Sequence, residues 1–467
     1  MMGILCKIAA MLGFGSNKEE HQPTTPAEQQ SAAPSPEPRE KQQLQSEESM
    51  TTKIKKYVLI GAGPASVRAA ETLRKADPSC SITMIGLEQE QPYSRMALPY
   101  YLSGIIEDSG THLRKTEGHF ESLNIEHVFA KVEKVEAEEH KVILDNGDSY
   151  DYDKLLIATG SRPANSPFPG AENDGVVNCW TLGDGREIMS HIKPGAKVAL
   201  LGAGFVASII IEAMLKKGVE LTVMMGRTGR MVSRMMDETA GDMIKSWCEA
   251  KGVSTIVPST IKSIEAGPAL RRDDDSLTEF DLIIVATGVY SNIEFLEGSG
   301  VETDNGILVD AGLHTNVEDI YAAGDVAQGL DFSTGGQSVH AIQPTAVDHG
   351  RIAAVNMMGG SSTYKGSLSM NVLDTSGLVS TSFGSWGGVE GGETASMLDK
   401  ENYKYIRLNF KGDLLVGAVT VGRTDNVGIL RGLIQSEVPL GEWKGKLIED
   451  PTLIMNAYLA QSLDAAR

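Results

Sequence analysis

Gly61, Gly63 and Ser66 have the spacing of residues that hold a phosphate group. They fill the three small positions of a G-x-G-x-x-G/A turn, in which the first glycine permits a tight turn and the second lets a pyrophosphate approach the backbone. Pro64 falls at the first helical position, where its missing N–H costs nothing, and Ala65 follows it. The pattern predicts a helix that presents free N–H groups to an anion; an ordinary glycine turn is the alternative.

The segments around this turn are typical of a parallel sheet. Residues 57–60 are a short apolar run that predicts a buried strand, and residues 81–86 predict a second one. Glu88 follows the second strand. A carboxylate at about this distance from the glycine turn can accept hydrogen bonds from the ribose hydroxyls of an adenosine. Glu90 is a neighbouring rival for that role.

The same pattern occurs a second time in the chain. Gly202, Gly204 and Ala207 occupy the three small positions, and Phe205 and Val206 would begin the helix that follows. A repeated nucleotide-binding unit is an internal duplication of function. The chain is therefore predicted to bind two nucleotides.

Length and composition predict a multidomain protein of ordinary globular type. The 467 residues suggest about three domains, and the formal net charge of -20 argues against nucleic acid and anionic lipid as general partners. The four cysteines form no C-x-x-C pair and stand at Cys6, Cys80, Cys179 and Cys248. They argue against a disulfide framework, a metal site or an iron–sulfur cluster, and favour a reducing, cytoplasmic compartment.

The N-terminal region differs in composition from the rest of the chain. Residues 1–14 are apolar apart from Lys7, too short to span a bilayer and a poor secretory signal. Residues 15–52 are rich in Gln, Glu, Pro and Ser and are predicted to be a disordered linker. An apolar peptide joined to the rest of the chain by a long linker suggests docking to a partner or to a membrane surface. A dispensable N-terminal extension is the alternative.

Six motifs in a fixed order give the chain a family resemblance. GAGPAS, PYSR, LLIATGSRP, a second GAG turn, LIIVATG and IYAAGDVA follow one another between Lys55 and Gly360. In this order they resemble the FAD-dependent pyridine nucleotide-disulfide oxidoreductase superfamily. The segment PYSRMALPYYLSG is similar to the branch that contains rubredoxin reductases, ferredoxin reductases and the nitrite reductase flavoprotein, although it carries no redox-active cysteine.

The resemblance implies an α/β fold with two Rossmann-like dinucleotide-binding domains of the three-layer ββα type, one inserted in the other, and a C-terminal α+β interface domain. The FAD-binding domain would comprise residues 53–165 and 289–360, and the NAD(P)H-binding domain residues 166–288. Residues 361–467 match the interface domain in position and size only. That domain often forms the dimer interface in the family, so the resemblance also allows a homodimer.

The resemblance assigns FAD to the first nucleotide site. Asp325 would accept a hydrogen bond from the flavin ribityl chain, and Gly324 would allow close approach of the phosphate. A helix with Pro344 at its start would aim the N–H groups of Thr345 and Ala346 at the flavin pyrimidine edge, where reduced flavin carries negative charge. The implied FAD-binding residues are Gly61, Gly63, Pro64, Ala65, Ser66, Glu88, Arg95, Ala158, Thr159, Gly160, Gly324, Asp325, Pro344, Thr345 and Ala346.

The second site would bind NADPH or NADH. Its second strand ends at Met225, where NADH-specific relatives usually carry a glutamate, and Arg227 and Arg230 follow. A guanidinium there could hold a 2′-phosphate, which favours NADPH; a solvated basic turn is the alternative. Ile209 stands where relatives often have a glutamate that helps to position the nicotinamide. The implied residues are Gly202, Gly204, Phe205, Val206, Arg227 and Gly288.

The cysteine-free segment decides the expected reaction class. Dithiol chemistry needs a thiol nucleophile, which residues 92–104 lack. Hydride transfer between two cofactors needs no side-chain acid, so neither a catalytic residue nor a metal is predicted. The chain is expected to pass electrons from NAD(P)H through FAD to an electron carrier such as rubredoxin, ferredoxin or a haem protein, or to a quinone. The alternative is an NAD(P)H-responsive flavoprotein that acts mainly as a binding or scaffold protein through its N-terminal peptide.

Overall fold

The computed structural model describes most of the chain after the N-terminal region, namely residues 54–226, 228–256 and 261–465. The predicted peptide 1–14, the linker 15–52 and Arg227 lie outside these residues. Residues 55–467 form a unit separate from residues 1–54, and the architecture described below belongs to this larger unit. The predicted domain limits stay predictions.

A five-stranded parallel sheet forms the first half of the architecture. Its strands in spatial order are β19 (Ile320–Ala322), β7 (Lys154–Ile157), β1 (Lys56–Ile60), β2 (Ser81–Gly86) and β3 (Ile125–Phe129). All of these strands except β3 are short runs of mostly buried, apolar residues, as suits a sheet covered on both faces. The two strands predicted around the first glycine turn are confirmed as β1 and β2.

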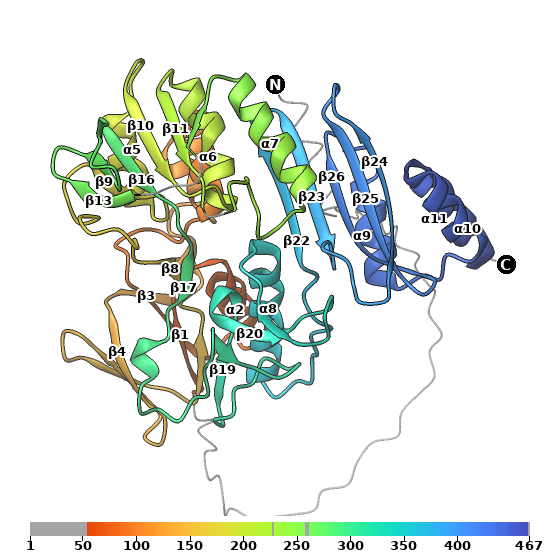
Figure 1. Cartoon of the computed structure of the whole chain (residues 1–467). Helices are drawn as coiled ribbons and strands as arrows, with labels where there is room; N and C mark the ends of the chain where they lie inside the picture. The colour runs from red at the N-terminus through yellow and green to blue at the C-terminus, as the bar shows by residue number, and fades with distance from the viewer. Residues whose placement is uncertain (1–53, 227, 257–260, 466–467) are drawn as a thin grey trace, which may run out of the picture. The chain divides into compact units, whose positions relative to one another are not determined.

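Two helices and a small antiparallel sheet cover this parallel sheet. Helices α2 (Pro64–Ala76) and α8 (Gln343–Met357) pack side by side (Figure 1). Strands β4 (Val132–Glu136), β5 (Lys141–Leu144) and β6 (Ser149–Asp151) contribute to the same hydrophobic core. The helix predicted to begin at Pro64 is confirmed. The three layers correspond to the predicted ββα arrangement.

A second parallel sheet repeats this plan. Its strands in spatial order are β12 (Ser254–Ile256), β11 (Glu220–Met224), β10 (Lys197–Leu201), β16 (Leu282–Val285) and β9 (Val176–Asn178). Alternate strand residues belong to two separate cores because successive side chains point to opposite faces. One core contains helices α5 (Leu182–His191), α6 (Phe205–Lys216) and α7 (Glu238–Ala250). The other contains strands β13 (Ile261–Glu265) and β14 (Ala269–Arg272), and β15 (Leu277–Glu279) pairs with β14 at the edge.

An antiparallel pair of short strands connects the two nucleotide-binding units. The chain leaves the first unit through β8 (Ser161–Pro163) and returns through β17 (Val289–Ser291), with Ser161 opposite Ser291. The second unit is therefore inserted in the first, and the predicted α/β fold with two Rossmann-like domains is confirmed.

A third sheet occupies the C-terminal region. Its strands in spatial order are β22 (Met370–Thr375), β23 (Leu378–Gly384), β26 (Leu414–Val421), β25 (Lys404–Lys411) and β24 (Glu393–Asp399), all antiparallel. Helix α9 (Val427–Ser436) follows the last of these strands in the chain, and α10 (Glu442–Glu449) and α11 (Ile454–Ala465) come after it. Figure 1 shows α7 running alongside this sheet. The Tyr405 hydroxyl and Arg407 Nη1 donate to the Asp237 carboxylate at 2.8 and 3.3 Å, which fixes the sheet on the second unit.

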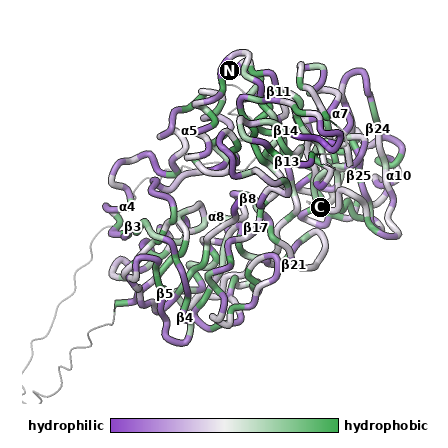
Figure 2. Tube along the Cα trace, turned by 60° about the vertical axis from the view of Figure 1, so that its left-hand side comes forward, coloured by the Kyte–Doolittle hydropathy of each residue, from purple (hydrophilic) through white to green (hydrophobic). Residues whose placement is uncertain are grey.

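Short elements complete the described chain: α3 (Leu98–Leu102), α4 (His119–Ser122), β18 (Ile307–Leu308), β20 (Ala327–Leu330), β21 (Gln337–Val339) and the 3-10 helices Arg95–Ala97, Asp108–Thr111, Glu294–Leu296, Gly324–Val326 and Pro451–Leu453. Hydrophobic segments gather along the packed strands, and hydrophilic segments follow the outer loops (Figure 2). Within the described residues, no helix is both long and apolar enough to cross a membrane.

Helix α7 is shorter than the stretch of apolar residues at helical spacing that contains it, residues 232–253. It begins at Glu238 because the Asp237 side chain accepts a hydrogen bond from the Ala240 N–H at 3.0 Å and caps the helix. The residues before Asp237 form turns, so the apolar spacing begins before the helix does.

Candidate functional site

The first glycine turn leaves room and free donors for a phosphate group. Gly61 has a φ of +111°, and a β-carbon built there would lie 2.2 Å from the Ala158 carbonyl oxygen. A β-carbon on Gly63 would meet nothing within 4 Å. Gly63 caps α2 without a side-chain hydrogen bond, so the N–H groups of Ala65 and Ser66 point out of the first helical turn. The turn therefore has the geometry that the sequence predicts.

The second glycine turn has the same geometry. Gly202 has a φ of +117°, and its β-carbon would lie 2.2 Å from the Ala286 carbonyl oxygen. Gly204 caps α6 without a side-chain hydrogen bond, and neither it nor Gly288 has an atom within 4 Å of a built β-carbon. The N–H groups of Phe205 and its successors are thus free for an anion.

Three predicted parts of the flavin site meet at Gly324. Gly324 has a φ of +77°, and its β-carbon would lie 3.4 Å from the β-carbons of both Ala65 and Ala346. A β-carbon on Gly350 would lie 2.1 Å from the Ala65 carbonyl oxygen, so α2 and α8 cross in close contact. The close approach of these two helices therefore involves Ala65 and Gly350, while Ser66 is fully buried.

Asp325 is a partly buried carboxyl that the protein itself does not satisfy. Burial raises its pKa from 3.8 to about 6, although the nearby charge of Arg95 acts in the opposite direction. Among the described residues, no group donates a hydrogen bond to this carboxyl. Hydroxyl donors of a ribityl chain would supply what is missing and favour the ionised form. The residues present therefore fit FAD at this point.

The start of α8 offers one of the two predicted donors. The Ala346 N–H already donates to the Ile342 carbonyl at 3.1 Å, which is the first bond of the helix. Pro344 has no N–H, so the Thr345 N–H is the donor that remains beside it. The Thr345 hydroxyl is paired with the Ser367 hydroxyl at 3.0 Å.

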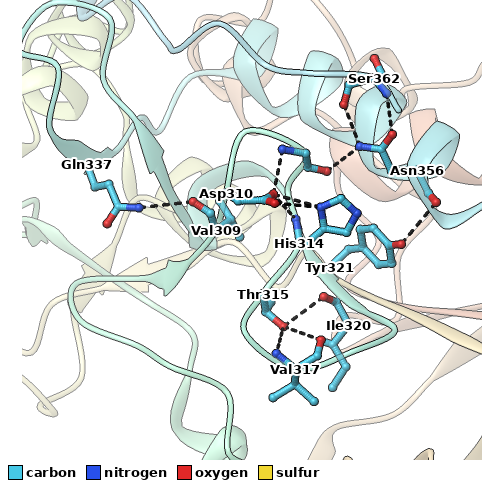
Figure 3. A network of polar contacts seen from close by, with 11 residues as sticks. Val309, Asp310, His314, Thr315, Val317, Ile320, Tyr321, Gln337, Asn356 and Ser362 are labelled. Atoms are coloured by element: carbon cyan, nitrogen blue, oxygen red, sulfur yellow. Dashed lines mark hydrogen bonds and ion pairs between the residues drawn. The ribbon is translucent and has the colours of Figure 1, made fainter. Parts of the chain in front are cut away.

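Hydrogen bonds at the other end of α8 hold the helix in place (Figure 3). The Asn356 amide donates to the carbonyls of Gly312 and Ser362 at 2.7 and 2.8 Å, and its oxygen accepts from the Ser362 N–H at 2.7 Å. The Tyr321 hydroxyl donates to the Asn356 carbonyl at 3.3 Å. Asn356 is 4% exposed, so these bonds fix the direction of the helix that points at the flavin site.

Glu88 and Arg95, both predicted FAD ligands, are bound to each other. Arg95 Nη2 donates to Glu88 Oε1 at 2.7 Å, and the Tyr93 hydroxyl donates to Glu88 Oε2 at 2.6 Å. The strand that precedes Glu88 ends at Gly86, whose β-carbon would lie 3.0 Å from that of Ala62. Gly86, which lies beside the glycine turn, thus has no side chain, and Glu88 is two residues further along the chain.

Two hydroxyl groups that the sequence prediction missed have the features of ligands. Thr287 Oγ1 and Ser161 Oγ are buried and have no hydrogen-bond partner among the described residues. Thr287 lies between Ala286 and Gly288 in the second Ala-Thr-Gly turn, and Ser161 directly follows the first. The repeated Ala-Thr-Gly motif was the available signal.

Burial lowers the pKa of both histidines near the site, His340 and His349. Burial and the neighbouring His340 lower the pKa of His349 to about 4. Its Nδ1 accepts from the Gly324 N–H at 3.3 Å. His340 lies near Asp331 at 3.6 Å, but its pKa is also lowered, chiefly by burial. Neither histidine acquires a role in proton transfer from this geometry.

The predicted specificity loop of the second site is described in part. The second strand of this site is followed by Met225, which is fully buried. A methionine has no carboxylate to offer to a ribose hydroxyl. Arg230 lies 3.9 Å from Glu238. The Val232 N–H donates to the Ala203 carbonyl at 2.7 Å, which brings the loop back to the glycine turn. Arg227 lies outside the described residues.

Two duplicated dinucleotide turns in Rossmann-like units, together with a helix aimed at the first of them, define a two-cofactor oxidoreductase. Residues 55–350 match the family model described as pyridine nucleotide-disulphide oxidoreductase. The chain belongs to this family and is an FAD-dependent NAD(P)H oxidoreductase, as the motifs predicted.

Relatives of known type cover most of the chain. It is 30% identical to the NADH-dependent phenylglyoxylate dehydrogenase subunit epsilon of Aromatoleum evansii over 87% of this chain and 98% of the relative. It is 31% identical to the ferredoxin–NAD(+) reductase component of the anthranilate 1,2-dioxygenase system of Burkholderia cepacia, over 66% of this chain and 77% of the relative. The covalent putidaredoxin reductase–putidaredoxin complex shares the fold, with a TM-score of 0.79 at 20% identity over 87% of this chain and 99% of that one. The scaffold alternative finds no support in these relatives.

Proposed function

We propose that this enzyme passes electrons from NAD(P)H through FAD to an electron-carrier protein. The observation that carries the proposal is the pair of complete nucleotide turns together with the absence of cysteine from residues 92–104, the segment that faces the flavin by the family resemblance. With no thiol to receive them there, the electrons go to an external acceptor. The phenylglyoxylate dehydrogenase subunit and the ferredoxin–NAD(+) reductase component, both similar to this chain, support an acceptor that is a protein.

The described residues divide the work between binding and orientation. When bound, FAD takes a hydride from the nicotinamide and releases its electrons to the acceptor. Ala65 and Ser66 would bind its pyrophosphate through their N–H groups, and Asp325 would bind its ribityl chain. Thr345 would donate from the start of α8, where the helix dipole favours negative charge. At the second site, Gly204 would let the pyrophosphate of the nicotinamide cofactor approach the backbone, and the N–H group of Phe205 would bind it.

Anaerobic stopped-flow spectroscopy tests the acceptor class. We expect NADH or NADPH to bleach the flavin and a ferredoxin or rubredoxin to restore its colour. Reoxidation by a quinone and by neither carrier would assign the enzyme to quinones. A flavin that neither nicotinamide cofactor reduces would overturn the proposal as a whole.

We also propose that the chain is a homodimer and that the N-terminal peptide docks to a partner or to a membrane surface. The C-terminal sheet, which is the family's interface region by position, supports the first statement. The apolar composition of residues 1–14 supports the second. Sedimentation of the full chain and of a variant without residues 1–52, with and without vesicles, tests both. Sedimentation as a monomer would contradict the homodimer. Failure of the full chain to bind vesicles would contradict docking of the peptide to a membrane surface.

A further inference from the structure

Three groups hold the side chain of Arg95 in one position. Arg95 Nη2 donates to Glu88 Oε1 at 2.7 Å, and Nη1 donates to the Ser161 carbonyl oxygen at 3.1 Å. The guanidinium carbon lies 5.2 Å from the centre of the Trp180 ring. Trp180 Nε1 donates to the same Ser161 oxygen at 2.7 Å. A guanidinium can stack on a ring and donate in its own plane at the same time, so these contacts are compatible with one another.

The partners of Arg95 are themselves fixed by neighbours. The Tyr93 hydroxyl donates to Glu88 Oε2 at 2.6 Å and accepts from the Leu182 N–H at 3.1 Å. The backbone N–H of Trp180 donates to the carboxylate of Asp184 at 2.9 Å, and Asp184 also forms the capping box that begins α5. Both carboxylate oxygens of Glu88 are therefore engaged inside the protein.

Backbone geometry places Arg95 at the first nucleotide site. Its acceptor Ser161 directly follows the Ala158-Thr159-Gly160 turn and lies opposite Ser291 in the β8–β17 pair. The Ser291 hydroxyl donates to the Asp325 carbonyl oxygen at 3.3 Å. Trp180 and Leu182, by contrast, stand at the start of α5, in the unit that carries the second nucleotide turn. The contacts thus join the two units at Arg95.

We propose that Glu88 and Trp180 are positioning residues that hold the Arg95 guanidinium at the flavin site, where its charge stabilises reduced flavin more than oxidised flavin. Reduced flavin is an anion, so a fixed cation beside it lowers its free energy, and the negative charge of the paired Glu88 offsets part of this effect. This role replaces the ribose contact expected of Glu88, and it gives Trp180 a function that no motif indicated. The inference rests on the proposed function in one respect only, that FAD occupies the first site.

A double-mutant cycle separates positioning from general stabilisation. The holoenzyme variants are Trp180→Leu, Arg95→Met and the two combined, and the measured quantities are the two-electron midpoint potential of the flavin and the dissociation constant of FAD. We expect Trp180→Leu to weaken the binding of reduced relative to oxidised flavin about tenfold, which is a potential lower by about 30 mV. In the Arg95→Met background the same change should shift the potential no further. Trp180→Phe keeps a ring for stacking and should give a smaller shift.

Glu88→Gln tests the other positioning residue in the same two backgrounds. If Glu88 binds the ribose, Glu88→Gln should weaken FAD binding by the same factor whether or not Arg95 is present. If Glu88 positions Arg95, Glu88→Gln should change the potential only when Arg95 is present. Glu90→Gln is the matched control, because the Glu90 carboxylate pairs with Arg186, and it should leave the potential unchanged.

Additive effects in both cycles would overturn the inference while leaving FAD-dependent electron transfer intact. If the wild-type chain bound no FAD at all, the proposed function would fail first. The two failures are therefore distinguishable by the colour of the purified wild-type protein.

Discussion

Gly61 lies so close to the carbonyl group of Ala158 that a β-carbon at Gly61 would stand 2.2 Å from the Ala158 oxygen. Gly202 and Ala286 repeat this contact at the second site, also at 2.2 Å. In both units the turn after one strand packs against the end of the neighbouring parallel strand. The duplication therefore extends from the sequence motif to the contact that closes each turn.

Gly61→Ala is expected to destabilise the fold, because the new methyl group meets backbone and the residue needs a φ of +111°. We expect a loss of at least about 2 kcal/mol in the free energy of unfolding, measured by denaturant titration. Gly63→Ala is the matched control, since its β-carbon would enter open space. It should keep the apoprotein's stability and weaken FAD binding, because the methyl group occupies the place of the pyrophosphate. Equal stability of both variants would contradict the close contact.

FAD binding should depend on the ionisation of Asp325. The pKa of its carboxyl is about 6 in the protein, and a ribityl hydroxyl donates better to the ionised form. FAD should therefore bind roughly tenfold more weakly at pH 5 than at pH 7. Asp325→Asn should bind FAD weakly across this range, by about 1.5–3 kcal/mol relative to wild type at pH 7. Equilibrium dialysis checks both, and a variant with wild-type affinity would refute the assignment.

The same carboxyl should make the apoprotein less stable as the pH rises. Its folded pKa of about 6 exceeds the ordinary 3.8, so its contribution is fully present below pH 3.8 and is lost as the pH rises through 6. A shift of about two pKa units corresponds to at most about 3 kcal/mol. The Asp325→Asn apoprotein should accordingly be more stable than wild type at pH 7.5 and should lose that advantage at pH 4. Thermal unfolding of the two apoproteins measures the difference.

Thr287→Val should separate folding from nucleotide binding. The Thr287 hydroxyl is buried without a partner among the described residues, so its removal should leave the apoprotein's stability unchanged or raise it by up to about 1 kcal/mol. If the nicotinamide cofactor supplies the missing partner, its dissociation constant should rise about fivefold to tenfold. Thr159→Val is the control, because Thr159 Oγ1 donates to the Asn292 carbonyl at 2.8 Å. Loss of this hydrogen bond should lower the apoprotein's stability without weakening the binding of the nicotinamide cofactor.

Arg230 provides a test of cofactor preference. If its guanidinium holds a 2′-phosphate, Arg230→Ala should raise the apparent KM for NADPH roughly tenfold, about 1.4 kcal/mol, and leave that for NADH nearly unchanged. Glu238→Gln should lower the KM for NADPH, because Glu238 lies 3.9 Å from Arg230 and competes for it. Arg227→Ala is measured in parallel. If all these variants and wild type prefer NADH equally, the arginines are surface residues.

Flavin reduction should be insensitive to thiol alkylation. The three described cysteines, Cys80, Cys179 and Cys248, are buried, and burial raises the pKa of Cys179 and Cys248 to about 12. Their thiols stay protonated and unreactive at neutral pH. After iodoacetamide treatment, mass spectrometry should find no modification at these positions, and NAD(P)H should bleach the flavin at the original rate. A loss of reduction would reveal a redox cysteine that the proposed function does not contain.

The sequence by itself determined the two glycine turns, the strands and helices around them, and the family. Each of these depends on local properties: Gly61 and Gly202 need a backbone conformation that side chains rarely adopt, and short apolar runs suit strands covered on both faces. Such requirements are written in the residues that satisfy them. For the same reason the motifs predicted which cofactors the chain uses before any contact was known.

Only the tertiary structure showed which neighbours individual polar side chains have at the site. Glu88, predicted at a ribose, accepts hydrogen bonds from Tyr93 and Arg95, and Trp180 contacts Arg95 from the other unit. The Ala346 N–H was expected to be free, but it belongs to the first turn of α8. A polar group satisfies its hydrogen bonds with whichever segment folding brings near, and residues far apart in the chain do not show that proximity in their order.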